Sequence, residues 1–189
     1  MRAVGPANAT AVSYPAGTVK EDWQVGDLLL THNEGFFPKI IRFGQRLRYR
    51  GDNAGYAWYN HVAVVVSPDG DLIEALSNGI VKTNARRYDN EFYSYVDVGL
   101  SESDRTKVGQ YAHRVADLNT KYGWTQIVAI SLSLLTGSRI QFGIQGQNIC
   151  SGFAAESLRG GGYWFERKGI ASSAMVTPAD LAHAFGSQQ

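Results

Sequence analysis

One stretch of the chain reads HVAVVVSPDGDLIEAL and covers residues 61–76. Its first part is β-branched and almost uniformly hydrophobic, which predicts a central strand buried on both faces of a sheet. The composition of residues 68–71, Pro-Asp-Gly-Asp, predicts a turn. Residues 72–76 are again mostly apolar and predict the returning strand. The stretch is therefore predicted to be an antiparallel hairpin, and the other elements can be arranged around it.

Two polar residues interrupt this hairpin. A buried Glu74 would be costly unless its carboxylate accepted hydrogen bonds, and His61 stands at the mouth of the first strand. A turn centred on residues 69–70 places Glu74 across from Val65, on the same sheet face as His61 but not beside it. Direct opposition would need a turn centred on residues 67–68, or a bulge. The alternative is an edge strand with Glu74 facing water.

The only cysteine, Cys150, lies in the stretch GQNICSGFAAESL, residues 146–158. A polar approach gives way there to good helix formers, so Cys150 is predicted at the N-cap or in the first turn of a helix. Unpaired amides and the positive end of the helix dipole favour a thiolate at such a position and supply donors for an oxyanion. The alternative is a buried, inert cysteine.

The remaining patterns predict an α+β fold class. Residues 1–20 show no hydrophobic period and are expected to be an N-terminal arm, and residues 21–189 a single domain, as the chain length of 189 residues also suggests. Periodicity and capping signals predict strands at 28–31, 79–83 and 93–98, and helices at 102–119, 124–136 and 178–185.

Residues 36–50 predict a short amphipathic helix. Its apolar residues recur near helical spacing and its arginines fall between them: Ile40, Ile41, Phe43 and Leu47, with Arg42, Arg46, Arg48 and Arg50. The arginines are expected to form a solvated face. A phosphate- or membrane-binding role for the cluster is the alternative.

Charge and composition exclude several classes of protein. Eighteen basic and seventeen acidic residues give a net charge of +1, which argues against nucleic acid as a partner. One cysteine cannot form an internal disulfide. The N-terminus shows no signal peptide, so a cytoplasmic location is the default expectation, with lysis, dedicated secretion or a phage particle as routes outward. The longest apolar segment, 127–135, is shorter than the roughly 20 residues of a transmembrane helix.

A thiolate nucleophile needs an imidazole to share its proton and a third polar group to orient that imidazole. His113 and His183 lie on predicted helices and are expected to be exposed or structural. His32 directly follows a strand and competes with His61, which is the preferred base because of its place at the mouth of the buried strand. A metal site built from His32, His61, Glu74 and Cys150 is a further alternative, although no close ligand spacing supports it.

Three segments of the chain resemble a known family. HVAVVV, a turn and LIEA resemble the His-Val-Gly-Ile … Ile-His/Glu-Ala hairpin of NlpC-type cysteine peptidases, which are papain-like, and GDLL at 26–29 resembles the Gly-Asp-Leu strand of the same superfamily. NICSG at 148–152 is similar to the cysteine-bearing helix start of the circularly permuted branch, which includes the lecithin retinol acyltransferase-like enzymes. The order His61, Glu74, Cys150 fits only that branch. Two departures are Ala63, where Gly is usual, and Gly152, where a larger polar residue is frequent.

The resemblance, which covers about residues 23–160, implies a permuted papain-like catalytic domain with an antiparallel sheet packed against helices, among them the cysteine-bearing helix. It implies Cys150 as nucleophile, His61 as general base and acid, and Glu74 as the group that orients the imidazole. The Cys150 amide would be one oxyanion donor. Thr31, His32 and Tyr59 are candidates for a second donor or for substrate binding, and no cofactor or metal is implied.

The function that follows from the resemblance is a cysteine hydrolase that cleaves amide bonds through a thioester, with cell-wall muropeptides as the substrate class. A thiol acyltransferase or lipid-amide hydrolase is the alternative, favoured if the helix at 124–136 and the aromatics Tyr163, Trp164 and Phe165 line an acyl pocket. A non-catalytic binding module on the same fold is the alternative of another class. The sequence leaves the oligomeric state open.

Overall fold

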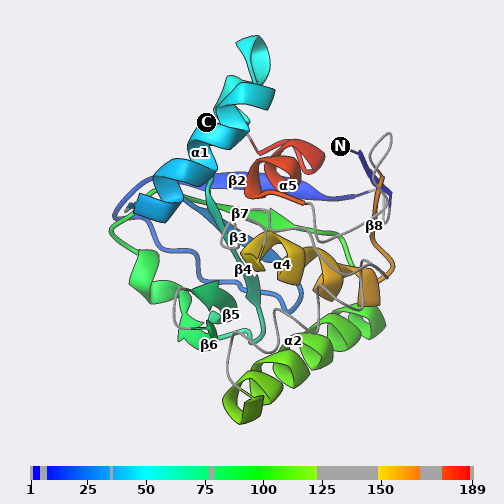
Figure 1. Cartoon of the computed structure of the whole chain (residues 1–189). Coiled ribbons are helices and arrows are strands. Elements are labelled where there is room, and N and C mark those ends of the chain that lie inside the picture. Colours follow the sequence, from blue (N-terminus) through cyan, green and yellow to red (C-terminus); the bar gives the residue numbers. More distant parts are fainter. Residues whose placement is uncertain are drawn as a thin grey trace.

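The structure is a computed structural model that describes residues 2–4, 8–34, 36–76, 79–122, 149–166 and 176–187. It has an α+β fold in which a six-stranded antiparallel sheet is flanked by helices (Figure 1). The strands are β1 (Arg2–Val4), β2 (Thr10–Tyr14), β3 (Leu28–Thr31), β4 (His61–Val65), β5 (Asp71–Leu76), β6 (Gly79–Asn84), β7 (Tyr93–Asp97) and β8 (Trp164–Glu166). The helices are α1 (Phe36–Arg48), α2 (Glu102–Tyr122), α4 (Ile149–Gly160) and α5 (Pro178–Ala184), with 3-10 helices η1 (Gly51–Trp58) and η2 (Ala85–Tyr88).

The main sheet has the strand order β2-β7-β3-β4-β5-β6, and β1 pairs with β8 in a separate two-stranded sheet. Every residue of β3 and β4 is buried, as their uniform hydrophobicity predicts. The segment expected to be an N-terminal arm contributes β2, an edge strand paired with β7. Most β2 side chains are exposed or half-buried, which explains why the sequence there shows no apolar period.

The hairpin of β4 and β5 forms as predicted, but its predicted register is wrong by two residues. Glu74 pairs with Ala63 rather than with Val65. The connection is a four-residue loop, 67–70, in which the Gly70 amide donates to the Ser67 carbonyl and Gly70 adopts a φ of 82°. A shift of two residues keeps Glu74 on the predicted face and brings it diagonally next to His61.

Both faces of the sheet are covered. On one face the larger core cluster joins β3, β4, β5 and β7 to α2, α4 and α5, and it includes Val62, Val64 and Ile73 of the hairpin. On the other face Leu29, Ala63, Val65 and Leu72 pack with Trp23 and with aromatic residues of β7. Residues of the two core clusters alternate along each strand. The face that carries the larger cluster is the one on which α4 packs against β4 and β5 (Figure 1).

Local capping signals give the helix starts correctly. The Asp104 amide donates to the Ser101 hydroxyl at the start of α2, and Thr177 and Asp180 form a reciprocal capping box at the start of α5. The helix predicted at 124–136 lies outside the described residues. Among the residues that are described, no helix is both long and apolar enough to cross a bilayer.

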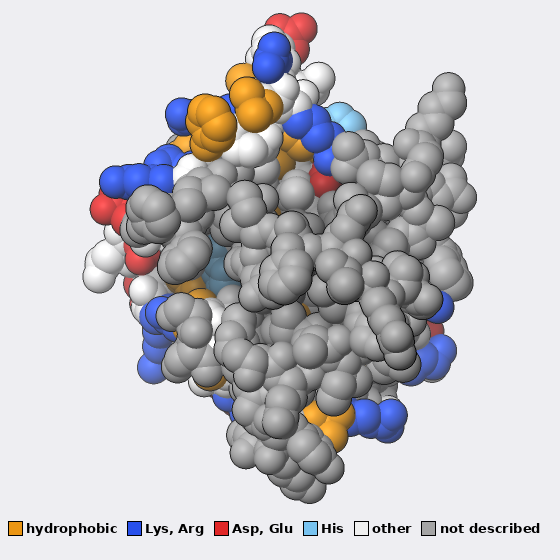
Figure 2. All heavy atoms as spheres, viewed as in Figure 1, with side chains coloured by type: hydrophobic (Ala, Val, Ile, Leu, Met, Phe, Trp, Pro, Cys, Tyr) orange, Lys and Arg blue, Asp and Glu red, His pale blue; other side chains and the backbone are white. Residues whose placement is uncertain are grey.

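Helix α1 forms where the sequence predicts it, but two of its apolar side chains face away from the protein. Gln45, on the side toward the body of the protein, and Tyr49, just beyond the helix, are buried. Phe43 and Leu47 are 67% and 55% exposed, and hydrophobic side chains stand beside basic ones on α1 in the space-filling view (Figure 2). Arg46 and Arg50 are exposed, as expected of a solvated arginine face, and Phe43 and Leu47 are exposed beside them.

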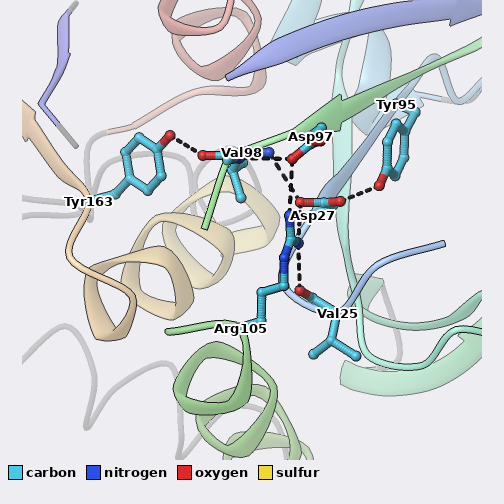
Figure 3. Close-up of polar contacts among 8 residues, drawn as sticks. Val25, Asp27, Tyr95, Asp97, Val98, Arg105 and Tyr163 are labelled. Atoms are coloured by element: carbon cyan, nitrogen blue, oxygen red, sulfur yellow. Dashed lines mark hydrogen bonds and ion pairs between the residues drawn. The ribbon is translucent and has the colours of Figure 1, made fainter. Parts of the chain in front are cut away.

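The Gly26-Asp27 turn before β3 is held by a polar network (Figure 3). Arg105 of α2 donates to the Asp27 carboxylate over 2.7 Å and to Asp97 over 3.0 Å, and Tyr95 also donates to Asp27. Burial raises the pKa of Asp27, and the hydrogen bonds from Tyr95 and Arg105 offset part of that shift. The network fastens α2 to the ends of β3 and β7.

Arg105→Met is expected to destabilise the protein by about 3 kcal/mol, because it leaves the buried Asp27 carboxylate without its cation. Urea unfolding measures the change. Lys107→Met, on the same helix but in an exposed ion pair, is the matched control and should leave the midpoint almost unchanged. Equal losses for the two variants would contradict a structural role for the network.

Candidate active site

The hairpin brings His61 and Glu74 together. The His61 Nε2 and Glu74 Oε2 atoms are 2.6 Å apart, and both side chains are buried. His61 is the first residue of β4, so it lies at the end of a central strand. The contact follows from the register, since Glu74 is the diagonal neighbour of His61 on the same face.

Glu74 is also held by three residues that the sequence did not single out. Thr83 donates to Glu74 Oε1 over 2.5 Å, Arg87 donates to the same oxygen over 3.0 Å, and Tyr88 donates to Oε2 over 2.7 Å. Thr83 lies on the neighbouring strand β6, and η2 carries Arg87 and Tyr88 directly after it. The alternation along β6 is the signal that would have placed Thr83 on the Glu74 face.

Cys150 is the second residue of α4, in the first turn as the sequence predicts. The thiol is free and buried. Next to it, the Ser151 hydroxyl donates to the Val176 carbonyl over 2.5 Å, which ties the start of α4 to the segment before α5. Ala154, Ala155 and Leu158 bury the helix against the sheet, so the helix start is fixed in place beside β4.

The three residues form one electrostatic unit. Burial alone would lower the pKa of His61, but interactions with Cys150 and with Glu74 raise it from 6.5 to about 9. Burial alone would raise the pKa of Glu74, but His61, Thr83 and Tyr88 lower it from 4.5 to about 2. Both shifts favour a charged imidazolium between the sulfur and an ionised carboxylate.

Cys150, His61 and Glu74 stand in the order that a nucleophile, its base and an orienting group would need. Because the Nε2 atom of His61 bonds Glu74, the other ring nitrogen, Nδ1, is the one available to the sulfur. Burial, followed by the charge of Glu74, raises the pKa of Tyr88, so its hydroxyl stays a neutral donor to Glu74. Chemically, such a set can hold a thiolate and move a proton to and from a reacting group.

Thr31, His32 and Tyr59, the candidates for a second oxyanion donor or for substrate binding, have different surroundings. Thr31 is buried and pairs with His61 across β3 and β4. His32 interacts through Nδ1 with the Trp58 carbonyl and through Nε2 with Arg42, over 2.8 and 2.9 Å. Of the three, Thr31 is therefore the one that the sheet places beside the catalytic candidates.

The Tyr59 hydroxyl is part of the core. It lies 2.6 Å from the Ser94 hydroxyl and accepts a hydrogen bond from Ser187 over 3.1 Å. These contacts join β7 to Ser187. Tyr59 is fully buried and packs in the larger core cluster. In the same part of the structure, Tyr163 donates to the Val98 carbonyl and its ring packs on Phe185.

Comparisons with known proteins leave the family open: no protein-family model matches this chain, and a search of curated proteins finds no match. Within the described ranges, no group of three or more His, Cys, Asp or Glu side chains is arranged to hold a metal ion.

The coupled charges predict how stability depends on pH. The lowered pKa of Glu74 contributes stability that is complete above about pH 4.5 and is lost as the pH falls toward about 2. The raised pKa of His61 contributes stability that is complete below about pH 6.5 and is lost as the pH rises through about 9. Unfolding midpoints measured in urea across this range are expected to fall at both ends.

Glu74→Gln is the control for the acid side, because it removes the titrating group but keeps a side chain of the same shape. Its stability should change less than that of the wild type between about pH 4.5 and 2. A wild-type profile that parallels the variant over this range would contradict the assignment of the lowered pKa to Glu74.

Proposed function

We propose that the protein is a cysteine hydrolase that cleaves amide bonds through a thioester acyl-enzyme. The observation that carries the proposal is the buried set of Cys150, His61 and Glu74, drawn from a helix start and two neighbouring strands. Cys150 is the nucleophile, His61 the base and acid, and Glu74 the residue that positions the imidazole.

The reaction has two halves. The Cys150 sulfur attacks the carbonyl carbon, the C–N bond breaks, and His61 gives its proton to the leaving amine. Water then attacks the thioester carbon while His61 takes up a proton, the C–S bond breaks, and the carboxylic acid leaves with the thiolate restored. Backbone amides at the start of α4 are suited to hold the negative oxygen that forms in each half.

Peptidoglycan peptides are the proposed substrate class. The support is the resemblance of the β4–β5 hairpin and of the Cys150 helix start to the permuted NlpC-type peptidases. The antiparallel sheet, with α4 against β4 and β5, is compatible with that fold class. Gly26-Asp27, the third element of the resemblance, holds α2 to the sheet through Arg105, which gives the motif a structural role.

A second candidate is a thiol acyltransferase or lipid-amide hydrolase. The observation that favours it is the pair of exposed apolar side chains on α1, Phe43 and Leu47. Tyr163 does not add to it, because that residue is committed to the core. A binding module without catalysis is the alternative of another class, and it would need neither a reactive thiol nor the His61–Glu74 pair.

The test is to incubate the protein with muropeptides and with fatty-acyl amides side by side and to read the products by mass spectrometry. The proposal expects a new carboxyl and amine pair from the muropeptides, and no product with Cys150→Ala. Cleavage of the acyl amides alone, or transfer of the acyl group to an acceptor, would establish the second candidate. Turnover that survives in Cys150→Ala would exclude both.

A further inference from the structure

The exposed side of α1 is apolar in its middle and basic around it. Phe43 and Leu47 are one helical turn apart and more than half exposed. Lys39 and Arg46 lie four positions before and three after Phe43 and are also exposed. Residues 36–50 contain five basic residues and no acidic one.

The described contacts of α1 toward the protein are polar. The Gln45 amide donates to the Tyr59 carbonyl over 2.8 Å and accepts from the Ala179 amide over 2.9 Å. The Tyr49 hydroxyl, just beyond α1, donates to Asp180 over 2.5 Å, and Arg48 pairs with the same carboxylate. These contacts hold α1 against η1 and α5, while Phe43 and Leu47 stay exposed.

We propose that the exposed face of α1, made by Lys39, Phe43, Arg46 and Leu47, docks on an anionic lipid bilayer. A bilayer surface offers an acyl layer for Phe43 and Leu47 directly beneath a layer of negative headgroups for the basic residues. A second copy of the chain fits less well, because it would bring the same positive charges together. Two large apolar side chains also fall far short of the roughly 800 Å² per partner of a stable protein interface.

This inference concerns where the protein binds, and it does not rest on the proposed chemistry. Cys150→Ala should bind bilayers as the wild type does, so failure of one proposal leaves the other standing. If both hold, α1 keeps the active site at a membrane surface.

The experiment is co-sedimentation with vesicles of phosphatidylcholine alone and of equal parts phosphatidylcholine and phosphatidylglycerol. The wild type is expected to bind the anionic vesicles, more weakly as salt rises. The double variant Phe43→Ser/Leu47→Ser should bind about tenfold more weakly or worse, and each of Lys39→Glu and Arg46→Glu about fivefold more weakly. In Phe43→Trp, tryptophan emission should shift to the blue on binding.

The matched control is Val12→Ser/Leu118→Ser, which removes two exposed apolar side chains elsewhere, 49% and 43% exposed, and should bind as the wild type does. Circular dichroism checks that each variant is folded. The proposal is overturned if the wild type binds neither kind of vesicle, or if Phe43→Ser/Leu47→Ser binds unchanged. It is equally overturned if that variant only turns a dimer into a monomer, which would make the face a contact between two copies.

Discussion

Cys150→Ala is expected to lower amide hydrolysis by at least about 10³-fold, because no other described group at this site can form the thioester. The structure should survive the change, since alanine suits a helix and α4 keeps its packing through Ala154 and Leu158. Product formation followed by mass spectrometry gives the rate, and circular dichroism gives the fold.

Ser157→Ala is the matched control for Cys150→Ala. Ser157 is buried on the same helix, two turns further along, and donates to the Phe153 carbonyl of its own helix. Its replacement should change the rate by less than about tenfold. A Cys150→Ala enzyme that keeps the wild-type rate would remove the nucleophile from the proposed reaction.

Glu74→Ala is expected to destabilise the protein by about 3–5 kcal/mol and also to abolish hydrolysis. The change leaves His61, Thr83 and Tyr88 without the acceptor that they share in a buried place. His61 would also lose the charge that favours its protonated form. Urea unfolding measures the first effect and the rate of hydrolysis the second.

Asp71→Ala, on the same strand but at the surface, is the control, and it should cost about 1 kcal/mol or less. Glu74→Gln should recover much of the stability, because its amide oxygen can still accept from Tyr88, while the rate stays low for want of a negative charge. If Glu74→Ala were as stable as Asp71→Ala, the buried network would not hold the site together.

The parts of the fold that depend on neighbouring residues could be predicted from the sequence. The short apolar run gives β3 and the β-branched run gives β4, and the Ser101 and Thr177 caps give the starts of α2 and α5. The sequence also placed His61 and Glu74 on the same face of the sheet, although the predicted register was wrong. An error of two residues preserves the sheet face, and the true loop of four residues, with Gly70 in the left-handed region, moves Glu74 nearer to His61.

The parts that depend on distant residues could not be predicted. Periodicity shows that α1 has an apolar stripe, but which side meets the protein is decided by partners such as Tyr59 and Asp180. In the same way, the partner of Asp27 is Arg105, 78 positions along the chain. A contact between residues so far apart in the sequence leaves no local sequence pattern from which it could be predicted.

The central claim is that His61, coupled to Cys150, makes the sulfur of Cys150 reactive. The most direct measurement is the rate at which iodoacetamide alkylates Cys150 at pH 6 and at pH 9, in the wild type and in His61→Gln. Alkylation of a free thiol of ordinary pKa is roughly two hundredfold slower at pH 6 than at pH 9. We predict that the wild type slows by less than about tenfold from pH 9 to pH 6, because His61 stays charged beside the sulfur over this range, and that His61→Gln behaves as a free thiol. A wild type that slows as much as His61→Gln would contradict the account.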